Sequence, residues 1–335
     1  MSENWNVSFS DGFFENHSKK RGGKEEKIDL IFKWGEHKVH IPSIYICSKG
    51  LVADILIEVD KEKIWSYINK FNLIKDEFAE NLSKDQRDEL ERENPLNHRY
   101  NTAIKVNKKL IRQFRGCGCS WIPELPEDKN PSKEAKEILE YYDKPLDKAW
   151  SIHRFNYEWV TVRKPKITSL EITLSQNKQN FPSEHFKNPQ IGDKFEITNP
   201  INGQKHQLNV VSLEKRTLDN LYNVVSGLEI PNNFTVMHYT VKPDIGIGNF
   251  NVEDIIEADI PRKINNHKEN SDFNSTEATS IGIIGGIDGP VTISYASIPP
   301  YRTATSSMHF DTEYDIEWRA VFREKQLEDI TITIV

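Results

Sequence analysis

Residues 28–41 read IDLIFKWGEHKVHI, and this stretch points to a β fold. Before Gly35, apolar and polar side chains alternate, as they do on a strand that buries one face. Gly35-Glu36 fits a two-residue turn with glycine in the first position, and the alternation resumes at Val39. The stretch therefore predicts an antiparallel β-hairpin.

The same period of two recurs along the chain. It is clear over 53–59 and 170–174, and again over 318–322 and 330–334, which we expect to pair as a terminal hairpin. Helical spacing is confined to a few stretches, such as the one that follows Asp60, a residue suited to capping a helix. Many short strands and few helices predict a mainly β (α+β) fold, with antiparallel β-sandwich or jelly-roll-like sheets and a few peripheral helices.

The length of 335 residues fits about two domains. We expect a β-rich first domain with helical excursions over residues 1–160. A second, more uniformly β and sandwich-like domain is expected over residues 161–335. The terminal strands could pair with either half.

Composition limits the partners and the compartment. Lys and Arg number 44 against 51 Asp and Glu, so the formal net charge of −7 disfavours phosphate backbones, and no nucleic-acid partner is expected. Three cysteines are too few for a disulfide framework. No apolar run is long enough to span a membrane, and the first residues do not read as a secretion signal. We therefore expect a cytoplasmic protein without a membrane partner.

Residues 309–317, HFDTEYDIE, place an ionisable side chain at every second position. On an extended strand these side chains share one face, and such clusters suit Ca²⁺ or Mg²⁺, or Mn²⁺ or Zn²⁺ where a histidine takes part. Neighbours on one face lie about 6.6 Å apart, so one ion would reach two of them only at a bulge. The alternative is an amphipathic strand whose polar face is solvated or paired with Lys and Arg. A divalent cation is the one cofactor that the sequence suggests, and its candidate ligands are His309, Asp311, Glu313, Asp315 and Glu317.

Cys117 and Cys119 flank Gly118 and would share one face of an extended segment. The nearby Arg112 and Arg115 would lower a thiol pKa, which makes the two cysteines a candidate redox or soft-metal pair. The alternative is a structural role, because the chain has no second cysteine pair to complete a zinc site.

Residues 280–290 read SIGIIGGIDGP and suggest a strand, a tight glycine loop and a second strand. Backbone N–H groups in such a loop could bind an anion, and the alternative is a hairpin tip without a ligand. The candidate loop site comprises Gly285, Gly286, Asp288 and Gly289.

This short segment resembles the Gly-Ile-Ile-Gly-Gly-x-Asp-Gly-Pro motif of the membrane β subunit of sodium-pumping decarboxylases. In that family the aspartate that matches Asp288 belongs to the sodium pathway within the membrane. The rest of this chain departs from that subunit and has no spanning segments, so sodium pumping is not expected. The whole chain also resembles an uncharacterised bacterial protein family that carries this segment, and that resemblance implies no activity.

No complete catalytic motif is present: the chain has no Gly-x-Ser-x-Gly, Walker A, His-Glu-x-x-His or Rossmann fingerprint. We therefore expect a soluble, non-catalytic binding or protein-interaction protein that binds a protein partner or itself. One alternative is a metal-assisted hydrolase that uses residues 309–317. The other is a self-assembling structural protein, because the last strand, from Ile330, runs on without a polar tail and could pair with another chain.

Overall fold

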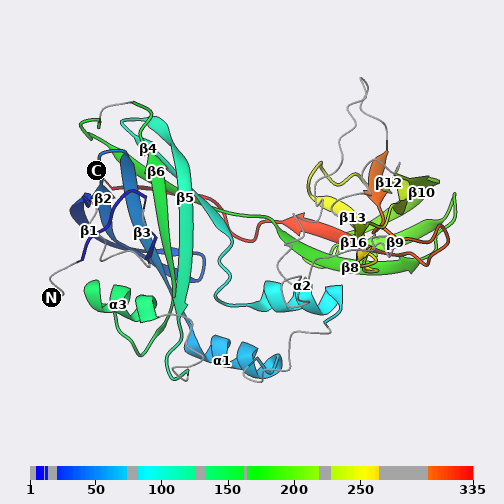
Figure 1. Ribbon diagram of the computed structural model, residues 1–335, viewed down its shortest axis with the longest axis horizontal. Coiled ribbons are helices and arrows are strands. Elements are labelled where there is room, and N and C mark those ends of the chain that lie inside the picture. Colours follow the sequence, from blue (N-terminus) through cyan, green and yellow to red (C-terminus); the bar gives the residue numbers. More distant parts are fainter. Residues whose placement is uncertain are drawn as a thin grey trace, which may run out of the picture. The chain divides into compact units, whose positions relative to one another are not determined.

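The structure is a computed structural model that describes residues 5–10, 12–13, 21–73, 82–125, 133–161, 164–218, 228–263 and 301–334. The chain divides into two compact units (Figure 1). Unit 1 comprises Met1–Gln179 and Lys325–Val335, and unit 2 comprises Asn180–Glu324. Strands dominate the described residues of both units, which confirms the mainly β, antiparallel prediction. The finer expectation, a sandwich or jelly-roll, stays a prediction.

Unit 1 is built on one eight-stranded sheet in which every neighbouring pair is antiparallel. The order of its strands across the sheet is β1 (Lys24–Trp34), β2 (His37–Ile46), β3 (Gly50–Val59), β6 (Ala149–Glu158), β5 (Lys109–Trp121), β4 (Tyr100–Val106), β7 (Leu170–Gln176) and β17 (Ile330–Thr333). The hairpin predicted over 28–41 is the β1–β2 pair, which is confirmed, with a bulge between Lys27 and Leu30.

One face of all eight strands contributes to a single apolar core. Its members run from Trp34 on β1 through the buried middle strands to Ile330 on β17. Because both edge strands reach the same core, the sheet curls around it. The two edges approach where the indole Nε1 of Trp34 donates a hydrogen bond to the carbonyl of Glu328, at 2.8 Å.

The opposite face of the sheet is covered by α3 (Lys133–Tyr141) and by residues of the N-terminal segment, including Val7 and Phe13. The predicted helix after Asp60 is α1 (Lys61–Lys70), and the carboxylate of Asp60 accepts a hydrogen bond from the backbone N–H of Glu62. A further helix, α2 (Lys84–Glu93), starts with a capping box at Ser83. Among the described residues, these short helices include none with the length and apolarity to cross a bilayer.

Unit 2 contains a four-stranded and a three-stranded sheet that share one apolar core. The first sheet has the order β15 (Arg302–Thr305), β12 (Asn233–Lys242), β10 (Lys205–Thr217) and β9 (Lys194–Thr198). The second has the order β13 (Phe250–Asp254), β16 (Glu317–Glu324) and β8 (Gln179–Lys187). A two-stranded ribbon pairs β11 (Leu228–Glu229) with β14 (Arg262–Lys263).

The chain divides at other places than the sequence pattern suggested. The predicted boundary near residue 160 lies inside unit 1, because β7 follows it and pairs with β4. The prediction that 318–322 and 330–334 pair as a terminal hairpin is wrong. β16 pairs with β13 in unit 2, whereas β17 pairs with β7 in unit 1. The reason is a long-range contact, since Gln176 at the end of β7 accepts hydrogen bonds from the backbone N–H groups of Gln326 and Leu327.

Candidate functional site

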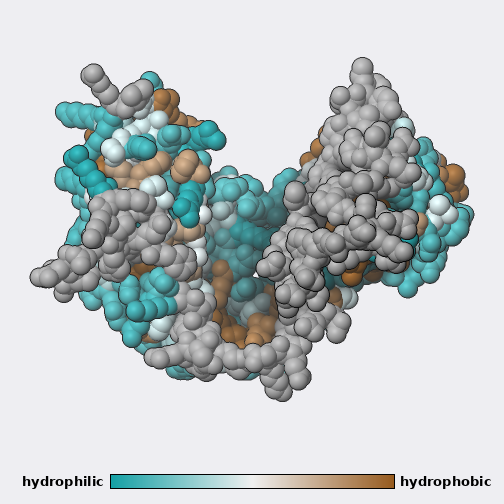
Figure 2. Space-filling view, viewed as in Figure 1, coloured by the Kyte–Doolittle hydropathy of each residue, from teal (hydrophilic) through white to brown (hydrophobic). Residues whose placement is uncertain are grey.

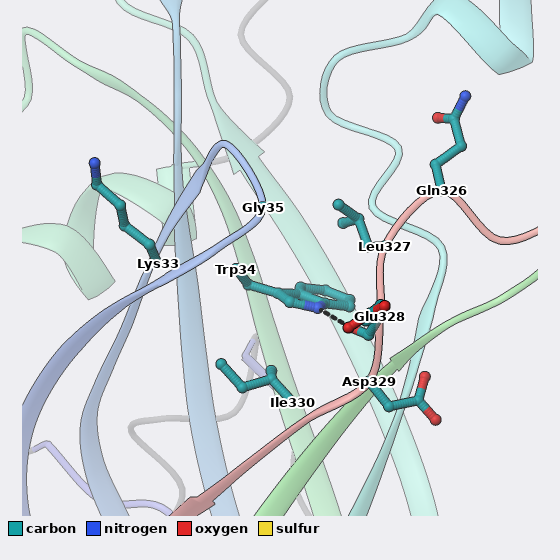
Figure 3. Close-up of a pocket in the computed structure, with 8 residues that line it drawn as sticks. All are labelled: Lys33, Trp34, Gly35, Gln326, Leu327, Glu328, Asp329 and Ile330. Atoms are coloured by element: carbon teal, nitrogen blue, oxygen red, sulfur yellow. Dashed lines mark hydrogen bonds between the residues drawn. The ribbon is translucent and has the colours of Figure 1, made fainter.

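A pocket of about 420 Å³ lies where the end of β1 meets the chain that leads into β17 (Figure 3). Trp34, Leu327 and Ile330 give it apolar walls. In Figure 3 the side chain of Lys33 and the carboxylate of Asp329 both point away from the indole of Trp34. The full lining is Lys33, Trp34, Gly35, Gln326, Leu327, Glu328, Asp329 and Ile330.

Each wall of this pocket is held by specific contacts. Gly35 has a φ of +61°, which a glycine adopts without strain, and Leu327 occupies the place where a Cβ on Gly35 would lie. On the other wall, the carboxylate of Asp329 accepts hydrogen bonds from Ser175, at 2.7 Å, and Lys325, at 2.9 Å. The segment that leads into β17 is therefore clamped to β7.

The pocket lies at one end of a longer feature, which we call the seam: the apolar inner faces of the edge strands β1 and β17 together with residues 326–329. β1 and β17 stand at the two ends of the strand order, so each has one side that pairs with no described strand. Ile28, Leu30 and Phe32 of β1 pack on the core but are only half-buried, as are Ile330 and Ile334. The core of unit 1 therefore reaches the surface along the seam.

The backbone of β17 presents hydrogen-bonding groups on its unpaired side. The N–H of Ile334 donates to the carbonyl of Leu170 on β7, at 2.8 Å. In an antiparallel ladder the backbone groups of successive residues point alternately to the two sides. The N–H and C=O groups of Thr331 and Thr333 therefore face away from β7, toward the seam.

The segment 309–317 is not the strand that its sequence predicted. His309 makes an isolated bridge with Asn233, and regular strand structure begins only at Glu317. The side chain of Asn233 donates to the carbonyls of both His309 and Phe310, which holds the segment out of a regular ladder.

The five candidate cation ligands do not converge. Glu313 pairs with Lys215 at 2.6 Å, Asp315 accepts from the amide of Asn188 at 3.1 Å, and Glu317 pairs with Lys187 at 2.9 Å. Asp311 interacts with Arg262. In the part of the chain that the structure describes, no three His, Cys, Asp or Glu residues are grouped so as to hold a metal ion.

His309 is itself buried and lies in a polar cluster that sequence reasoning missed. Its Nδ1 lies 3.5 Å from a carboxylate oxygen of Asp259, and its ring lies 4.2 Å from that of Tyr314. Burial raises the pKa of the nearby Asp254, whose carboxylate accepts the backbone N–H groups of Ile256 and Ser307. Asp254 and Asp259 lie fifty or more positions before His309 and Tyr314 in the sequence, so no local pattern could connect the two groups.

Cys117 and Cys119 lie on β5 and form no disulfide, and both contact the apolar cluster beneath α3. Burial raises the pKa of Cys117 and outweighs the lowering that Arg154 and Arg115 contribute, so the net shift is opposite to the one expected from the arginines. The glycine-loop candidates Gly285, Gly286, Asp288 and Gly289 lie outside the described residues.

A second polar network fastens α3 and the N-terminal segment to the sheet. Asp54 and Arg154 are both fully buried and form a two-bonded ion pair, with both N–O distances at 2.7 Å. The hydroxyl of Tyr142 donates to Asp54 at 2.6 Å, and the guanidinium of Arg154 donates to the carbonyl of Gly12. All of these groups bond one another inside the protein, which indicates a structural role.

Histidines gather beside the turn that closes β1 and β2. The rings of His37 and His98 lie 4.6 Å apart. Burial lowers the pKa of His98 to about 3, with further contributions from His37 and His153. Burial also lowers the pKa of His153 to about 4. These imidazoles are therefore neutral near pH 7.

Fold and site together define a mainly β protein of two units, with a pocket of mixed polar and apolar lining where the two edges of the eight-stranded sheet approach each other. Figure 2 shows hydrophilic colours over most of the described surface on this side, interrupted by separate hydrophobic patches. No family model, curated protein or solved structure matches this chain.

Proposed function

We propose that this chain is a non-catalytic protein-interaction protein and that the seam of unit 1 is its binding site. The observation that carries the proposal is the half-buried apolar row on β1 and β17, which ends in the pocket at Trp34. Elsewhere in the same core, side chains such as Ile55 and Ile172 are fully buried. Covering the seam would therefore remove further apolar surface from water, at about 25 cal/mol per Å².

The lining of the pocket favours binding over chemistry. Two of its hydrogen-bonding groups are already engaged, the indole N–H of Trp34 by the carbonyl of Glu328 and the carboxylate of Asp329 by Ser175 and Lys325. The surface that remains toward a ligand includes the apolar side chains of Leu327 and Ile330. A metal-assisted hydrolase on residues 309–317 gains no support, because those carboxylates engage separate partners.

Charge and cysteine chemistry support the kind of partner and the compartment. The formal net charge of −7 favours a protein over a nucleic acid as the partner. Cys47, Cys117 and Cys119 form no disulfide in the structure, which supports a reducing compartment such as the cytoplasm.

The proposal is tested by selecting linear peptides from a random library displayed on phage, with the full chain as the target. We expect Ile330→Asp to weaken the binding of the selected peptides by at least about tenfold, because the substitution places a charge in the seam. The matched control is Ile247→Asp, since Ile247 is 92% exposed in unit 2. Failure to select any peptide, or equal losses in both variants, would contradict the proposal.

A further inference from the structure

We infer that the partner enters the seam as an extended polypeptide segment of another protein, which adds to β17 as a strand with alternating apolar side chains. This inference rests on the proposed function and names the mode of binding at the same site. Three independent features of the seam carry it: its backbone groups, its side chains and its closed end.

The backbone of β17 selects a polypeptide as the ligand. Thr331 and Thr333 each direct one N–H and one C=O away from β7, with the spacing of a strand. A second extended chain supplies the complementary donors and acceptors at that spacing, as in strand-addition complexes. A lipid or another simple apolar ligand would cover the core but leave these groups without protein partners.

The side chains along the seam select an alternating sequence. An added strand points successive side chains to opposite faces of the sheet. Those on the inner face would contact Phe32 on one side and Ile330 and Ile334 on the other. Those on the outer face would continue the exposed row in which the hydroxyls of Thr173 and Thr331 lie 2.9 Å apart. The segment therefore needs apolar residues at every second position.

The closed end of the seam limits where the segment stops. The bond from Trp34 to Glu328 and the packing of Leu327 on Gly35 join the two edges there. An added strand must end at this junction, with one inward side chain in the pocket between Trp34, Leu327 and Ile330. A bulky apolar residue would pack there on Leu327 and Ile330, because the indole N–H of Trp34 is already bonded and the side chain of Lys33 points away from the indole (Figure 3).

The two edges differ in their readiness to pair with a strand. β1 carries exposed Lys27 and Lys33 and a bulge at Asp29, whose φ is +47°, and such features oppose strand pairing. β17 carries threonines and no charge over Ile330–Thr333. A second copy that paired through unit 1 would have to offer its protected β1 or its short β17, so a different protein is the better occupant.

The test compares two substitutions at one position with a fluorescently labelled peptide from the phage selection. Thr331→Pro removes the N–H that faces the seam, and proline is tolerated on edge strands when its missing N–H would face outward. Thr331→Val keeps the N–H, and both variants lose the same hydroxyl. We expect the proline variant to bind at least about tenfold more weakly and the valine variant to stay within about twofold of the wild type.

A second measurement needs no substitution and covers the case in which the proline variant is misfolded. In the wild-type chain the peptide should slow amide hydrogen exchange at Thr331 and Thr333. Peptide binding with equal affinity in both variants and no slowing of these amides would overturn strand addition while leaving the proposed function intact. If no peptide binds, both fail. Sedimentation of the free chain would reveal a dimer. If a dimer forms and Thr331→Pro abolishes it, the occupant is a second copy and the inference is overturned.

Discussion

Gly35 shows how one residue shapes the candidate site. Its backbone conformation is left-handed, and Leu327 packs where its side chain would begin. We expect Gly35→Ala to lower the free energy of unfolding by about 2–3 kcal/mol, from backbone strain plus a steric clash. Gly203→Ala is the control, because Gly203 also has a positive φ, +72°, but open space around it, so only the strain of about 1 kcal/mol applies. Urea unfolding measures both, and equal losses would contradict the packing of Leu327 on the turn.

We expect the buried pair of Asp54 with Arg154 to contribute more to the free energy of unfolding than an exposed ion pair does. Asp54→Ala would leave the Arg154 guanidinium buried without a counter-charge, which costs about 3–5 kcal/mol. Glu196→Ala removes a partner of Lys205 in a pair whose side chains are both 66% exposed, and should cost less than about 1 kcal/mol. Denaturant unfolding of both variants checks the contrast. A small loss in Asp54→Ala would mean that the pair is not buried as described.

At the scale of elements, sequence patterns predicted which residues form strands better than they predicted which strands pair with each other. The β1–β2 hairpin follows from local alternation and a glycine turn, and α1 follows from its cap at Asp60. The pairing of β17 with β7 depends on Gln176, which lies about 150 positions away from Gln326, so no local signal encodes it. The sequence could not predict the seam for the same reason. It indicated that the last strand is an unprotected edge, but it did not indicate which core that strand completes.

The histidines beside the β1–β2 turn make the stability of this part of the sheet depend on pH. In the folded state the pKa of His98 is about 3 and that of His153 about 4, against 6.5 for an unperturbed histidine. Between those values the unfolded chain binds more protons, so stability is full above pH 6.5 and falls as the pH falls toward 4. We expect a loss of about 2 kcal/mol or more for each histidine across this window.

Urea unfolding from pH 7.5 to pH 4.5 measures this loss, and His98→Gln should reduce the slope of stability against pH. A wild-type stability that does not change over the window, or a slope that the substitution leaves as it was, would show that these imidazoles are not buried in the neutral form.

At the scale of the whole molecule, the chain leaves unit 1 at Gln179 and returns to it at Lys325. Deleting residues 330–335 removes Ile330 and Ile334 from the core of unit 1 and uncovers β7. We expect faster amide exchange in β4 and β7 and unchanged exchange in β10 and β12, which belong to the core of unit 2. Faster exchange in both units would contradict the division, and no change in either would show that β17 does not belong to the fold.

The measurement that tests the central claim most directly is residue-resolved amide exchange of the wild-type chain, with and without the selected peptide. Strand addition at the seam predicts slower exchange at Thr331 and Thr333, whose N–H groups face away from β7. Ile332 and Ile334, whose N–H groups face β7, should change much less. Protection that falls on other strands, with Thr331 and Thr333 exchanging as in the free chain, would contradict the account.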